Sequence, residues 1–335
     1  MSDKKFIIGI VGATGAVGQE IIQVLNQHQI KFYQLKLFSH QSHLVSTPWG
    51  SMTSKPFDFF QISQCDIIFL AVNGTFSQQY ALQLAQNSLV IDNSSAFRYK
   101  PEIPLVIPEI NKNLISQSNL IANPNCTTAI ALMALYPIYQ TFGLQKIIIS
   151  TYQAASGAGQ AGIQELENQL KEKNYQVKVF PQTLAYNVIP HIDQFQSNGY
   201  TKEEMKVVWE IQKILNDDNI KISCTAVRVP TLRCHAEAIT IETKKPVDLS
   251  SIKQLYQQAP GVKLIDDVDN ASILSKEAYP TPLSLTGVNE VGVGRLRLNP
   301  VFENKGLDLF VCGDQLLRGA ALNAVLIAKE YMTKI

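Results

Sequence analysis

The sequence predicts an α/β protein with a doubly wound parallel sheet, followed by a second domain with a mixed sheet and helices on one face. Three observations support this fold class. The 335 residues suit two domains. Short apolar runs alternate with helical patterns up to about Asn125. Several β-branched, strand-like runs follow Cys126. We expect residues 1–125 and 315–335 to form the first domain and residues 126–314 the second.

The composition gives no reason to expect a nucleic-acid or membrane partner. The net charge is only +1, and no apolar run reaches transmembrane length. The N-terminus lacks the long apolar segment of a signal peptide. The five cysteines include no C-x-x-C pair, which fits neither a disulfide framework nor a zinc site. We therefore expect a cytoplasmic protein without a bound metal.

The first strand and helix carry a glycine-rich turn. Residues 6–11 are an apolar run of strand length, residues 12–18 read GATGAVG, and a helical pattern follows over residues 19–27. Gly12 and Gly15 would let the backbone approach a pyrophosphate, whose charge the helix N-terminus attracts. The spacing is a relaxed form of the dinucleotide motif, so a turn selected only for tight packing is the alternative.

The second strand indicates which dinucleotide is bound. It covers residues 33–38 and ends at a loop that contains Gln41 and Ser42. An NAD-binding unit usually places a carboxylate about 20 residues after the glycine turn, to hold the ribose 2′-hydroxyl. Residues 21–57 contain no Asp or Glu. Hydroxyl and imidazole groups without a nearby acid favour a 2′-phosphate, so the sequence predicts NADP.

The rest of the first domain continues the alternation. We expect strands at residues 66–72, 89–92, 105–107 and 120–122, with a helix over residues 76–86. The loops that follow these strands are where open α/β sheets bind ligands.

A cysteine follows the last of these strands. The segment NPNCTT, residues 123–128, precedes a long apolar helical pattern, so Cys126 lies in the first turn of a helix. Unpaired N–H groups and the helix dipole favour a thiolate there, which suits a nucleophile. The alternative is a small cysteine packed in the core.

The second domain supplies further candidate residues. A second glycine loop, residues 153–159, follows a strand at residues 146–152. Thr201 and Glu204 form a capping box for a helix that runs to Leu215. We expect further strands at residues 222–229, 236–242, 262–265, 293–298 and 307–311, and a buried last helix, residues 315–331, that returns to the first domain.

Each candidate side chain here also has a plainer interpretation. Arg228 could bind a carboxylate in a planar fork or form a surface ion pair. His235 lies in a tight connection and could be a core histidine bonded to a backbone carbonyl. Glu203 and Lys206 share one helix face, where a solvated ion pair is the simpler reading.

Together these segments resemble the aspartate-semialdehyde dehydrogenase family from about residue 5 to 333. The motifs occur in the family's order; they are GATGAVG (12–18), DNSSAFR (92–98), VIPEIN (106–111), NPNCTT (123–128), QAASGAG (153–159), RVP (228–230) with His235, VGRLR (293–297) and CGDQLLRGAA (312–321). The cysteine, arginine–histidine and C-terminal motifs are specific, whereas the glycine turn is widespread.

The resemblance implies an enzyme of lysine, threonine and methionine biosynthesis that uses NADPH to reduce L-aspartyl-4-phosphate to the semialdehyde and releases phosphate. It implies a fold similar to glyceraldehyde-3-phosphate dehydrogenase and a homodimer. It makes Cys126 the nucleophile, His235 the acid/base and Gln153 the residue that orients the intermediate. The implied substrate-binding residues are Arg98 and Lys206 for phosphate, and Arg228 and Glu203 for the carboxylate and amino groups. The cofactor-binding residues would be Gly12, Thr14, Gly15, Ala16, Val17, Gln41, Ser42, Ser156, Gly157 and Gln315.

Two positions depart from the family pattern. Gln41 stands where an arginine commonly holds the 2′-phosphate, which weakens the prediction of NADP selectivity. Asn73-Gly74 replaces a Gly-Gly pair after the third strand. Glu203 and Glu204 could also exchange roles. The alternatives are N-acetyl-glutamyl-phosphate reductase, which has a different cysteine motif, and a non-catalytic paralogue, although the nucleophile, base and phosphate cation are all present.

Overall fold

The computed structural model describes residues 5–172, 175–267 and 278–334. The chain forms two compact units, one made of residues up to Asn125 together with those from Gly319, and one of Cys126–Arg318. The segment from Gln315 to Arg318 therefore belongs to the second unit. The chain returns to the first unit at Gly319, four residues after the predicted boundary at residue 315.

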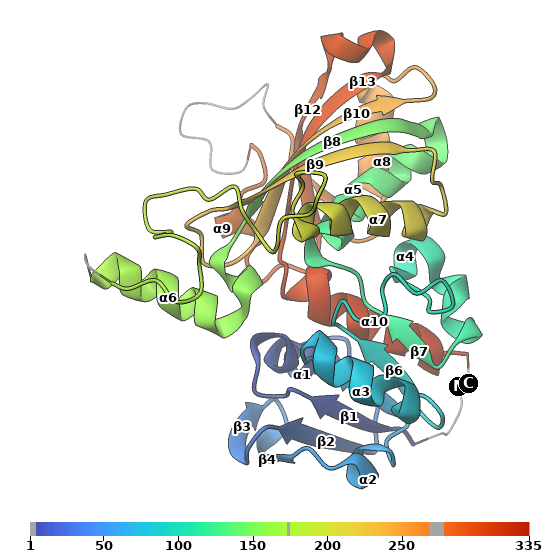
Figure 1. Ribbon diagram of the computed structural model, residues 1–335. Helices are drawn as coiled ribbons and strands as arrows, with labels where there is room; N and C mark the ends of the chain where they lie inside the picture. Colours follow the sequence, from blue (N-terminus) through green and yellow to red (C-terminus); the bar gives the residue numbers. More distant parts are fainter. Residues whose placement is uncertain (1–4, 173–174, 268–277, 335) are drawn as a thin grey trace. The chain divides into compact units, whose positions relative to one another are not determined.

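The first unit contains a seven-stranded sheet in the order β3-β4-β2-β1-β5-β6-β7 (Figure 1). All neighbours are parallel except β3 and β4. The strands are β1 (Ile7–Val11), β2 (Gln34–Ser39), β3 (His43–Thr47), β4 (Gly50–Pro56), β5 (Ile67–Leu70), β6 (Leu89–Asp92) and β7 (Leu120–Ala122). The predicted doubly wound sheet is thus confirmed, while the β3–β4 hairpin was not predicted.

The helices of this unit are α1 (Ala16–Gln27), α2 (Phe59–Ile62), α3 (Gly74–Leu84), α4 (Pro108–Asn111), the 3₁₀ turn η1 (Lys112–Gln117) and α10 (Leu322–Met332). A strand at residues 105–107 was wrong, because Leu105 forms only an isolated bridge with Ala122. The last helix also begins later than predicted, after a π-helical turn, η4 (Leu317–Ala321). Its buried apolar residues pack against α1 and α4.

The second unit contains a six-stranded mixed sheet in the order β11-β12-β13-β10-β8-β9. The β8–β9 and β11–β12 pairs are parallel and the other pairs antiparallel. The strands are β8 (Leu144–Gln153), β9 (Lys221–Arg228), β10 (His235–Thr243), β11 (Val262–Leu264), β12 (Val291–Leu298) and β13 (Gly306–Gly313). The predicted mixed sheet is confirmed.

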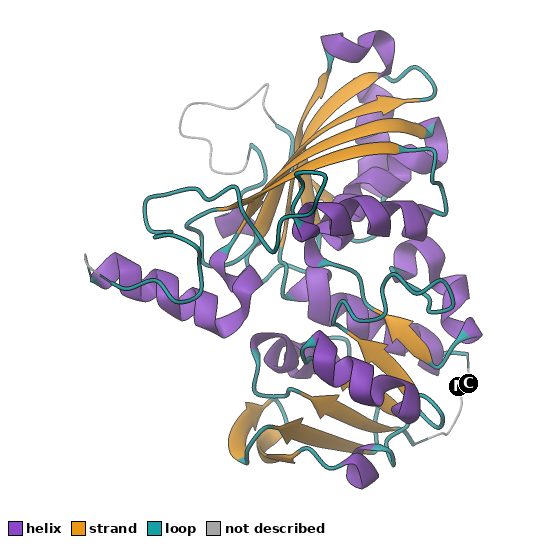
Figure 2. Cartoon of the chain, viewed as in Figure 1, coloured by secondary structure: helices purple, strands orange, loops and turns teal. Residues whose placement is uncertain are grey.

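Helices cover one face of this sheet (Figures 1 and 2). The covering helices are α5 (Cys126–Phe142), α7 (Lys202–Leu215) and α8 (Leu249–Gln258); the remaining turns and helices are η2 (Ala155–Ala158), α6 (Gly159–Lys171), α9 (Pro282–Leu285) and η3 (Pro300–Lys305). Along β8, Ile147 and Ile149 are buried while Ile148 and Tyr152 are exposed. Because side chains alternate along a strand, the latter pair lies on the face opposite the helices.

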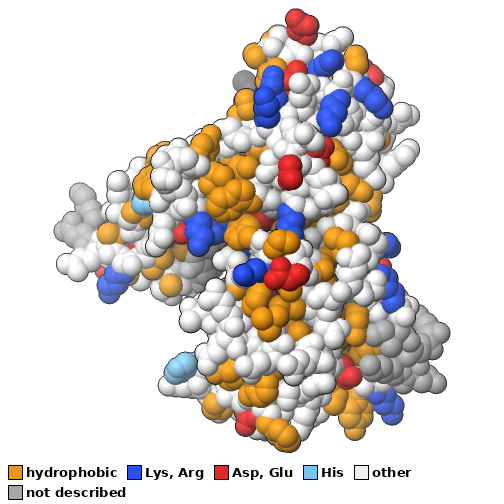
Figure 3. All heavy atoms as spheres, turned by 45° about the vertical axis from the view of Figure 1, so that its right-hand side comes forward, with side chains coloured by type: hydrophobic (Ala, Val, Ile, Leu, Met, Phe, Trp, Pro, Cys, Tyr) orange, Lys and Arg blue, Asp and Glu red, His pale blue; other side chains and the backbone are white. Residues whose placement is uncertain are grey.

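On the face shown in Figure 3, the Lys and Arg side chains of the described residues are interspersed with Asp and Glu side chains. Across the described ranges, every helix is too short or too polar to span a bilayer.

Candidate active site

The sheet register of the second unit brings three predicted site residues into one row. Gln153 at the end of β8 pairs with Arg228 at the end of β9. His235 begins β10, whose next residue, Ala236, pairs with Tyr152. Gln153, Arg228 and His235 are all buried. They are far apart in the sequence, and the strand pairing alone makes them neighbours.

Cys126 is the first residue of α5, as the sequence predicted. Of the five cysteines, all of which are described, it alone is partly exposed, whereas the other four are buried. The Arg228 guanidinium interacts electrostatically with Glu203 and Cys126; burial lowers the pKa of Arg228, and these two negative partners oppose that shift. A thiolate at Cys126 would therefore face a cation and the N-terminus of a helix.

His235 is fully buried, and its two ring nitrogens have different surroundings. The backbone N–H of Ala154 donates to Nδ1 at 3.0 Å. Nε2 has no hydrogen-bond partner among the described residues. Burial, with a further contribution from Arg228, lowers the pKa of His235 to about 3 despite the opposing effects of Glu203 and the Cys234 carbonyl. The ring is thus bonded to backbone groups on both sides of its position in the fold, the Ala154 amide and the Cys234 backbone.

Two buried side chains lie close to Gly157 in the second glycine loop. A methyl group on its Cα would lie 2.5 Å from Arg228 Nη1 and 3.3 Å from His235 Nε2. Arg228 Nη1 also donates to the Ala154 carbonyl at 2.7 Å. The absent side chain therefore makes room for a guanidinium and an imidazole on the same side of the loop.

A chain of polar contacts runs from this row to α7. Gln153 Nε2 donates to Thr127 Oγ1 and to Glu203 Oε1, the latter at 3.2 Å. Lys206 Nζ lies 3.0 Å from Glu203 Oε2 and 2.7 Å from Asp193 Oδ2. Burial disfavours the charge on Lys206, but Glu203 and Asp193 outweigh it and raise the pKa of Lys206. The ion pair is therefore largely shielded rather than solvated.

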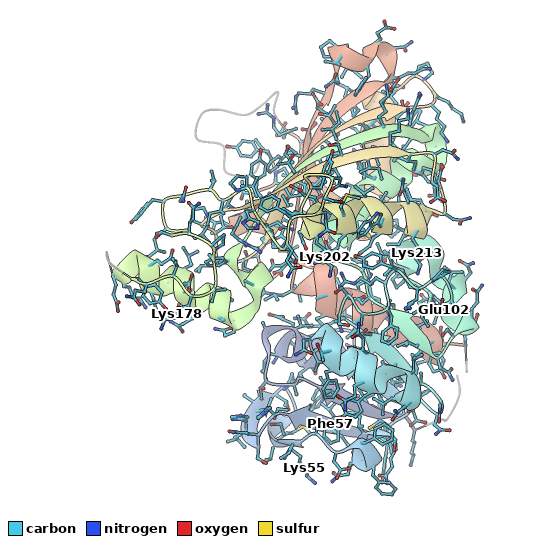
Figure 4. All side chains as sticks on the ribbon, viewed as in Figure 1. Lys55, Phe57, Glu102, Lys178, Lys202 and Lys213 are labelled. Carbon is cyan, nitrogen blue, oxygen red and sulfur yellow. The ribbon has the colours of Figure 1, made fainter. Side chains whose placement is uncertain are left out.

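The two adjacent glutamates on α7 have different partners. Lys202, labelled in Figure 4, begins this helix, and Lys213, also labelled there, lies in its last turn. The predicted capping box is confirmed, since the Thr201 amide donates to Glu204 and the Glu204 amide donates to Thr201. Glu204 also accepts from the Ala226 amide at 2.9 Å. Glu204 is thus occupied in holding the helix start, while Glu203 faces the polar cluster.

The C-terminal motif supports the loop before His235. Gln315 Oε1 accepts from the Cys234 amide at 2.7 Å, and Gln315 Nε2 donates to Ser156 Oγ. Asp314 forms a 2.7 Å ion pair with Arg233. Two predicted cofactor contacts, Ser156 and Gln315, are therefore bonded to one another within the second unit.

The glycine turn of the first unit lies between β1 and the start of α1. Gly12 has a φ of +85°, and a methyl group on it would lie 2.2 Å from the Ala71 carbonyl oxygen. Thr14 and Gly15 are exposed just before α1, and Ala16 and Val17 form its first turn. Exposed N–H groups at a helix start can bind a pyrophosphate.

The loop after β2 and the loop after β6 hold the other predicted residues of this unit. Gln41 and Ser42 are exposed, whereas Ser39 is buried and bonded to Ser54 Oγ at 2.7 Å. Arg98 is buried and donates to the carbonyl oxygens of Asn123 at 2.8 Å and Asn93 at 2.9 Å. The described residues contain no cluster of three His, Cys, Asp or Glu side chains that could hold a metal ion.

The comparisons with known proteins match both units. Residues 7–118 match the family described as "Semialdehyde dehydrogenase, NAD binding domain", and residues 135–318 match "Semialdehyde dehydrogenase, dimerisation domain". The aspartate-semialdehyde dehydrogenase of Shewanella violacea is 41% identical over 97% of both chains, and that of Synechocystis is 39% identical over 96% of both. The chain belongs to the aspartate-semialdehyde dehydrogenase family.

Solved structures of aspartate-semialdehyde dehydrogenases agree with this assignment. The Vibrio cholerae aspartate semialdehyde dehydrogenase II, described as complexed with ASA, is 38% identical with a TM-score of 0.92 and covers 99% of both chains. The chain thus has the NAD(P)-binding domain and the dimerisation domain of this family of oxidoreductases. The sequence-based prediction of the family is confirmed.

Sequence reasoning missed two features of this candidate site. Asp193, which binds Lys206, lies in an irregular segment and has a left-handed φ of +67°. Asp tolerates this conformation better than most residues, but that signal is weak. The Ala154 amide cannot be recognised from the sequence at all, because every residue except proline carries an N–H group.

Proposed function

We propose that this family member catalyses the NADPH-dependent reductive dephosphorylation of L-aspartyl-4-phosphate to L-aspartate 4-semialdehyde, a step in the biosynthesis of lysine, threonine and methionine. The observation that carries the proposal is the electrostatic proximity of Cys126, at the start of α5, to Arg228, in the same sheet row as Gln153 and His235. This arrangement suits a thiolate nucleophile beside groups that bind an acyl substrate.

The reaction divides into two steps at the sulfur. The Cys126 thiolate attacks the acyl carbon, a C–S bond forms, and the C–O bond to phosphate breaks. The thioester is then reduced to the aldehyde, and the C–S bond electrons return to Cys126 as thiolate. When bound, NADPH supplies the hydride for this reduction. Sulfur is suited to the task because a thioester accepts hydride more readily than a carboxylate does.

Each charged group of the substrate would be bound by a side chain of opposite charge. Arg228 offers a planar fork for the α-carboxylate, and Glu203 would bind the amino group. Lys206 would neutralise the phosphate as it leaves, and the family resemblance implies the same role for Arg98. Lys206 suits this role because Glu203 and Asp193 keep it protonated.

The first unit would bind the dinucleotide. A side chain at Gly12 would collide with the Ala71 carbonyl, so this position requires glycine, and the residues from Thr14 to Val17 lie at the start of α1, where a helix can bind a phosphate. We propose a preference for NADP over NAD, which Gln41 would make modest. Comparison of kcat/KM for the two cofactors tests this, and equal values would contradict it.

We also propose a homodimer that forms through the uncovered face of the second unit's sheet. Ile148 and Tyr152 are exposed there, and the Tyr152 ring lies 6.3 Å from that of Phe310. A row of exposed apolar side chains on a sheet is typical of an interface. The match to a dimerisation domain over residues 135–318 supports this assignment.

A mass spectrum tests the catalytic proposal. Enzyme quenched with aspartyl phosphate in the absence of NADPH should carry an aspartyl adduct on the peptide that contains Cys126. Burial disfavours reaction elsewhere, raising the pKa of Cys65 to about 11 and of Cys234 to about 12. Cys126→Ala should abolish turnover and the adduct while NADP binding persists. An adduct on another residue, or full activity of Cys126→Ala, would overturn the proposal.

Activity with two different semialdehydes distinguishes this function from the alternatives. Phosphate-dependent reduction of NADP should occur with aspartate semialdehyde and not with N-acetyl-glutamate semialdehyde. A non-catalytic paralogue would reduce NADP with neither aldehyde.

A further inference from the structure

The guanidinium of Arg228 has two neighbours of different kinds. Nη1 donates to the Ala154 carbonyl at 2.7 Å. The central guanidinium carbon lies over the ring of Phe180, 5.9 Å from the ring centroid. A single hydrogen bond leaves a guanidinium free to turn about that bond, whereas an aromatic ring beside it also restricts its plane. The two contacts together favour one orientation of the planar fork.

An aromatic ring can hold this cation without competing with a substrate. The attraction arises from the ring quadrupole and does not depend on a hydrogen bond, so it requires none of the five N–H donors of the guanidinium. A carboxylate in the same place would occupy N–H groups that an incoming carboxylate needs. Arg228 and Phe180 are both buried, and a cation–π contact is stronger there than at the surface.

The backbone of Phe180 is fixed by a buried acid on α6. Glu165 accepts from three consecutive amides, those of Lys178 at 2.7 Å, Val179 at 2.8 Å and Phe180 at 3.2 Å. Hydrogen bonds to an ionised acceptor are stronger than those between neutral groups. This carboxylate therefore anchors an irregular segment at the residue that carries the ring.

The ring of Phe180 is also closely packed. It belongs to a buried cluster that includes Ala155, Leu166 and Leu184. A methyl group on Gly162, in α6, would lie 3.2 Å from Phe180 Cζ, so the tip of the ring lies close to the helix backbone. Packing at this density keeps the ring in one place beside the guanidinium.

The same irregular segment holds the backbone of Arg228. The Ile189 amide donates to the Arg228 carbonyl at 2.9 Å, and the Arg228 amide donates to the Ile189 carbonyl at 2.8 Å. Ile189 belongs to the same buried cluster as Phe180. The segment therefore contacts Arg228 at both ends, by hydrogen bonds at the backbone and by the ring at the guanidinium.

On the basis of the proposed function, we propose that Phe180 is a positioning residue whose ring holds the Arg228 guanidinium in the plane that binds the substrate's α-carboxylate. Glu165 supports this role because it fixes the backbone of Phe180. A guanidinium that is already ordered loses less freedom when the substrate binds, which strengthens binding. Lys206 is the proposed phosphate ligand, so the ring should affect the binding of the carboxylate and not that of phosphate.

The test replaces Phe180 with phenylalanines that carry one or two fluorines at the meta positions. Fluorine withdraws electrons from the ring face and weakens its attraction for a cation, while Cζ, which lies close to Gly162, keeps its hydrogen. Oxidation of aspartate semialdehyde with inorganic phosphate separates the two ligands, because only the semialdehyde carries the carboxylate. The KM for the semialdehyde should rise with each fluorine, by about 2-fold or more with two, whereas kcat and the KM for phosphate stay nearly unchanged.

The same fluorinated residues at Phe195 provide the control. Phe195 lies in the same irregular segment, and its ring stacks on His191 with the centroids 4.4 Å apart. Fluorination of Phe195 should leave the KM for the semialdehyde unchanged. Three results would overturn the proposal: a KM that does not respond to fluorination of Phe180, equal responses at the two positions, or a parallel rise in the KM for phosphate.

Removal of the ring provides a second measurement. Phe180→Leu keeps an apolar side chain but has no ring face, so the KM for the semialdehyde should rise by about 3- to 30-fold, the range of a lost cation–π contact. Circular dichroism checks that the variant is folded. Wild-type KM in a folded Phe180→Leu would contradict the role of the ring. Failure of the proposed function would be recognised separately, because the wild type itself would then not oxidise aspartate semialdehyde.

Discussion

At the residue scale, side chains of one type differ because of what surrounds them. Cys126 begins a helix and is partly exposed, while burial raises the pKa of the Cys224 and Cys312 thiols well above the ordinary value. Glu203 and Glu204 are neighbours in the chain, yet one contacts Gln153 and Lys206 and the other closes the capping box. The residue type alone marked these cysteines and glutamates as candidate site residues, and their surroundings in the fold show how they differ.

Gly157 provides a prediction at this scale. In Gly157→Ala, the new methyl group would displace the Arg228 guanidinium and crowd the His235 ring. Because small misplacements of catalytic groups are costly, kcat/KM should fall by about 10²-fold. Steady-state kinetics measures the loss, and circular dichroism checks the fold. Gly74→Ala is the control, since its methyl group would meet only Ala96 at 3.9 Å; equal activity of the two variants would contradict this role of Gly157.

At the element scale, the start of α7 fixes the position of Glu203 and Lys206. The helix begins after Thr201, whose hydroxyl accepts from the Glu204 amide. Burial of Val207, Ile211 and Ile214 keeps one face of the helix against the sheet. The cap and the apolar stripe together place two charged side chains in the polar cluster.

Removal of this cap should affect both stability and substrate binding. Thr201→Ala should cost about 1 kcal/mol of the free energy of unfolding and raise KM, because the first turn carries Glu203. Asp248 caps α8 in the same way, accepting from the Ser251 amide. Asp248→Ala should also lower the denaturant midpoint of unfolding but leave KM unchanged. If both variants have wild-type KM, the α7 cap does not position the site.

Strand β10 contains a buried acid that provides a prediction on pH. Neither carboxylate oxygen of Glu237 has a hydrogen-bond partner among the described residues, and burial raises the pKa of Glu237 well above the usual value. The unfolded chain loses this proton at a lower pH than the folded protein. Protonated Glu237 is therefore fully compatible with the fold below the pKa that this group has in the unfolded chain. The free energy of unfolding falls as pH rises from there toward the higher pKa of Glu237 in the folded protein.

Glu237→Gln should remove this pH dependence. At high pH, the free energy of unfolding of the wild type is lower by about 1.4 kcal/mol for each pKa unit that separates the folded from the unfolded state. The variant should therefore melt close to the wild type near pH 4 and above it at pH 8, as thermal unfolding can measure. A wild type that is the more stable of the two at pH 8 would show that the ionised form has a partner.

At the scale of the whole molecule, the open sheet face should determine the oligomeric state. Ile148→Arg places a charge among apolar side chains of the proposed interface, and Ile148 is 47% exposed in the single chain. We expect the dimer dissociation constant to rise by about 30-fold or more, equivalent to about 2 kcal/mol. Light scattering over a concentration series measures this. Leu44→Arg, on β3 of the first unit, should leave the wild-type mass unchanged, and a monomeric wild type would contradict the interface.

The sequence by itself determined the features that depend on local spacing. The glycine turn, the capping box at Thr201 and the position of Cys126 at a helix start all follow from residues within one or two turns of chain. Apolar runs of strand length were enough to predict the central strands of both sheets, because those strands are buried in the fold. The β3–β4 hairpin was missed. The short strand predicted at residues 105–107 failed because three apolar residues do not specify a pairing partner.

Only the tertiary structure decided which groups meet and in what chemical form. Gln153, Arg228 and His235 become neighbours through the strand register, which depends on the packing of the whole sheet. The hydrogen bond that His235 Nδ1 accepts comes from a single backbone amide, and the crowding around Gly157 comes from two side chains that are distant in the sequence. Neither leaves a pattern in the sequence, because backbone amides are common to nearly every residue and long-range contacts have no fixed spacing.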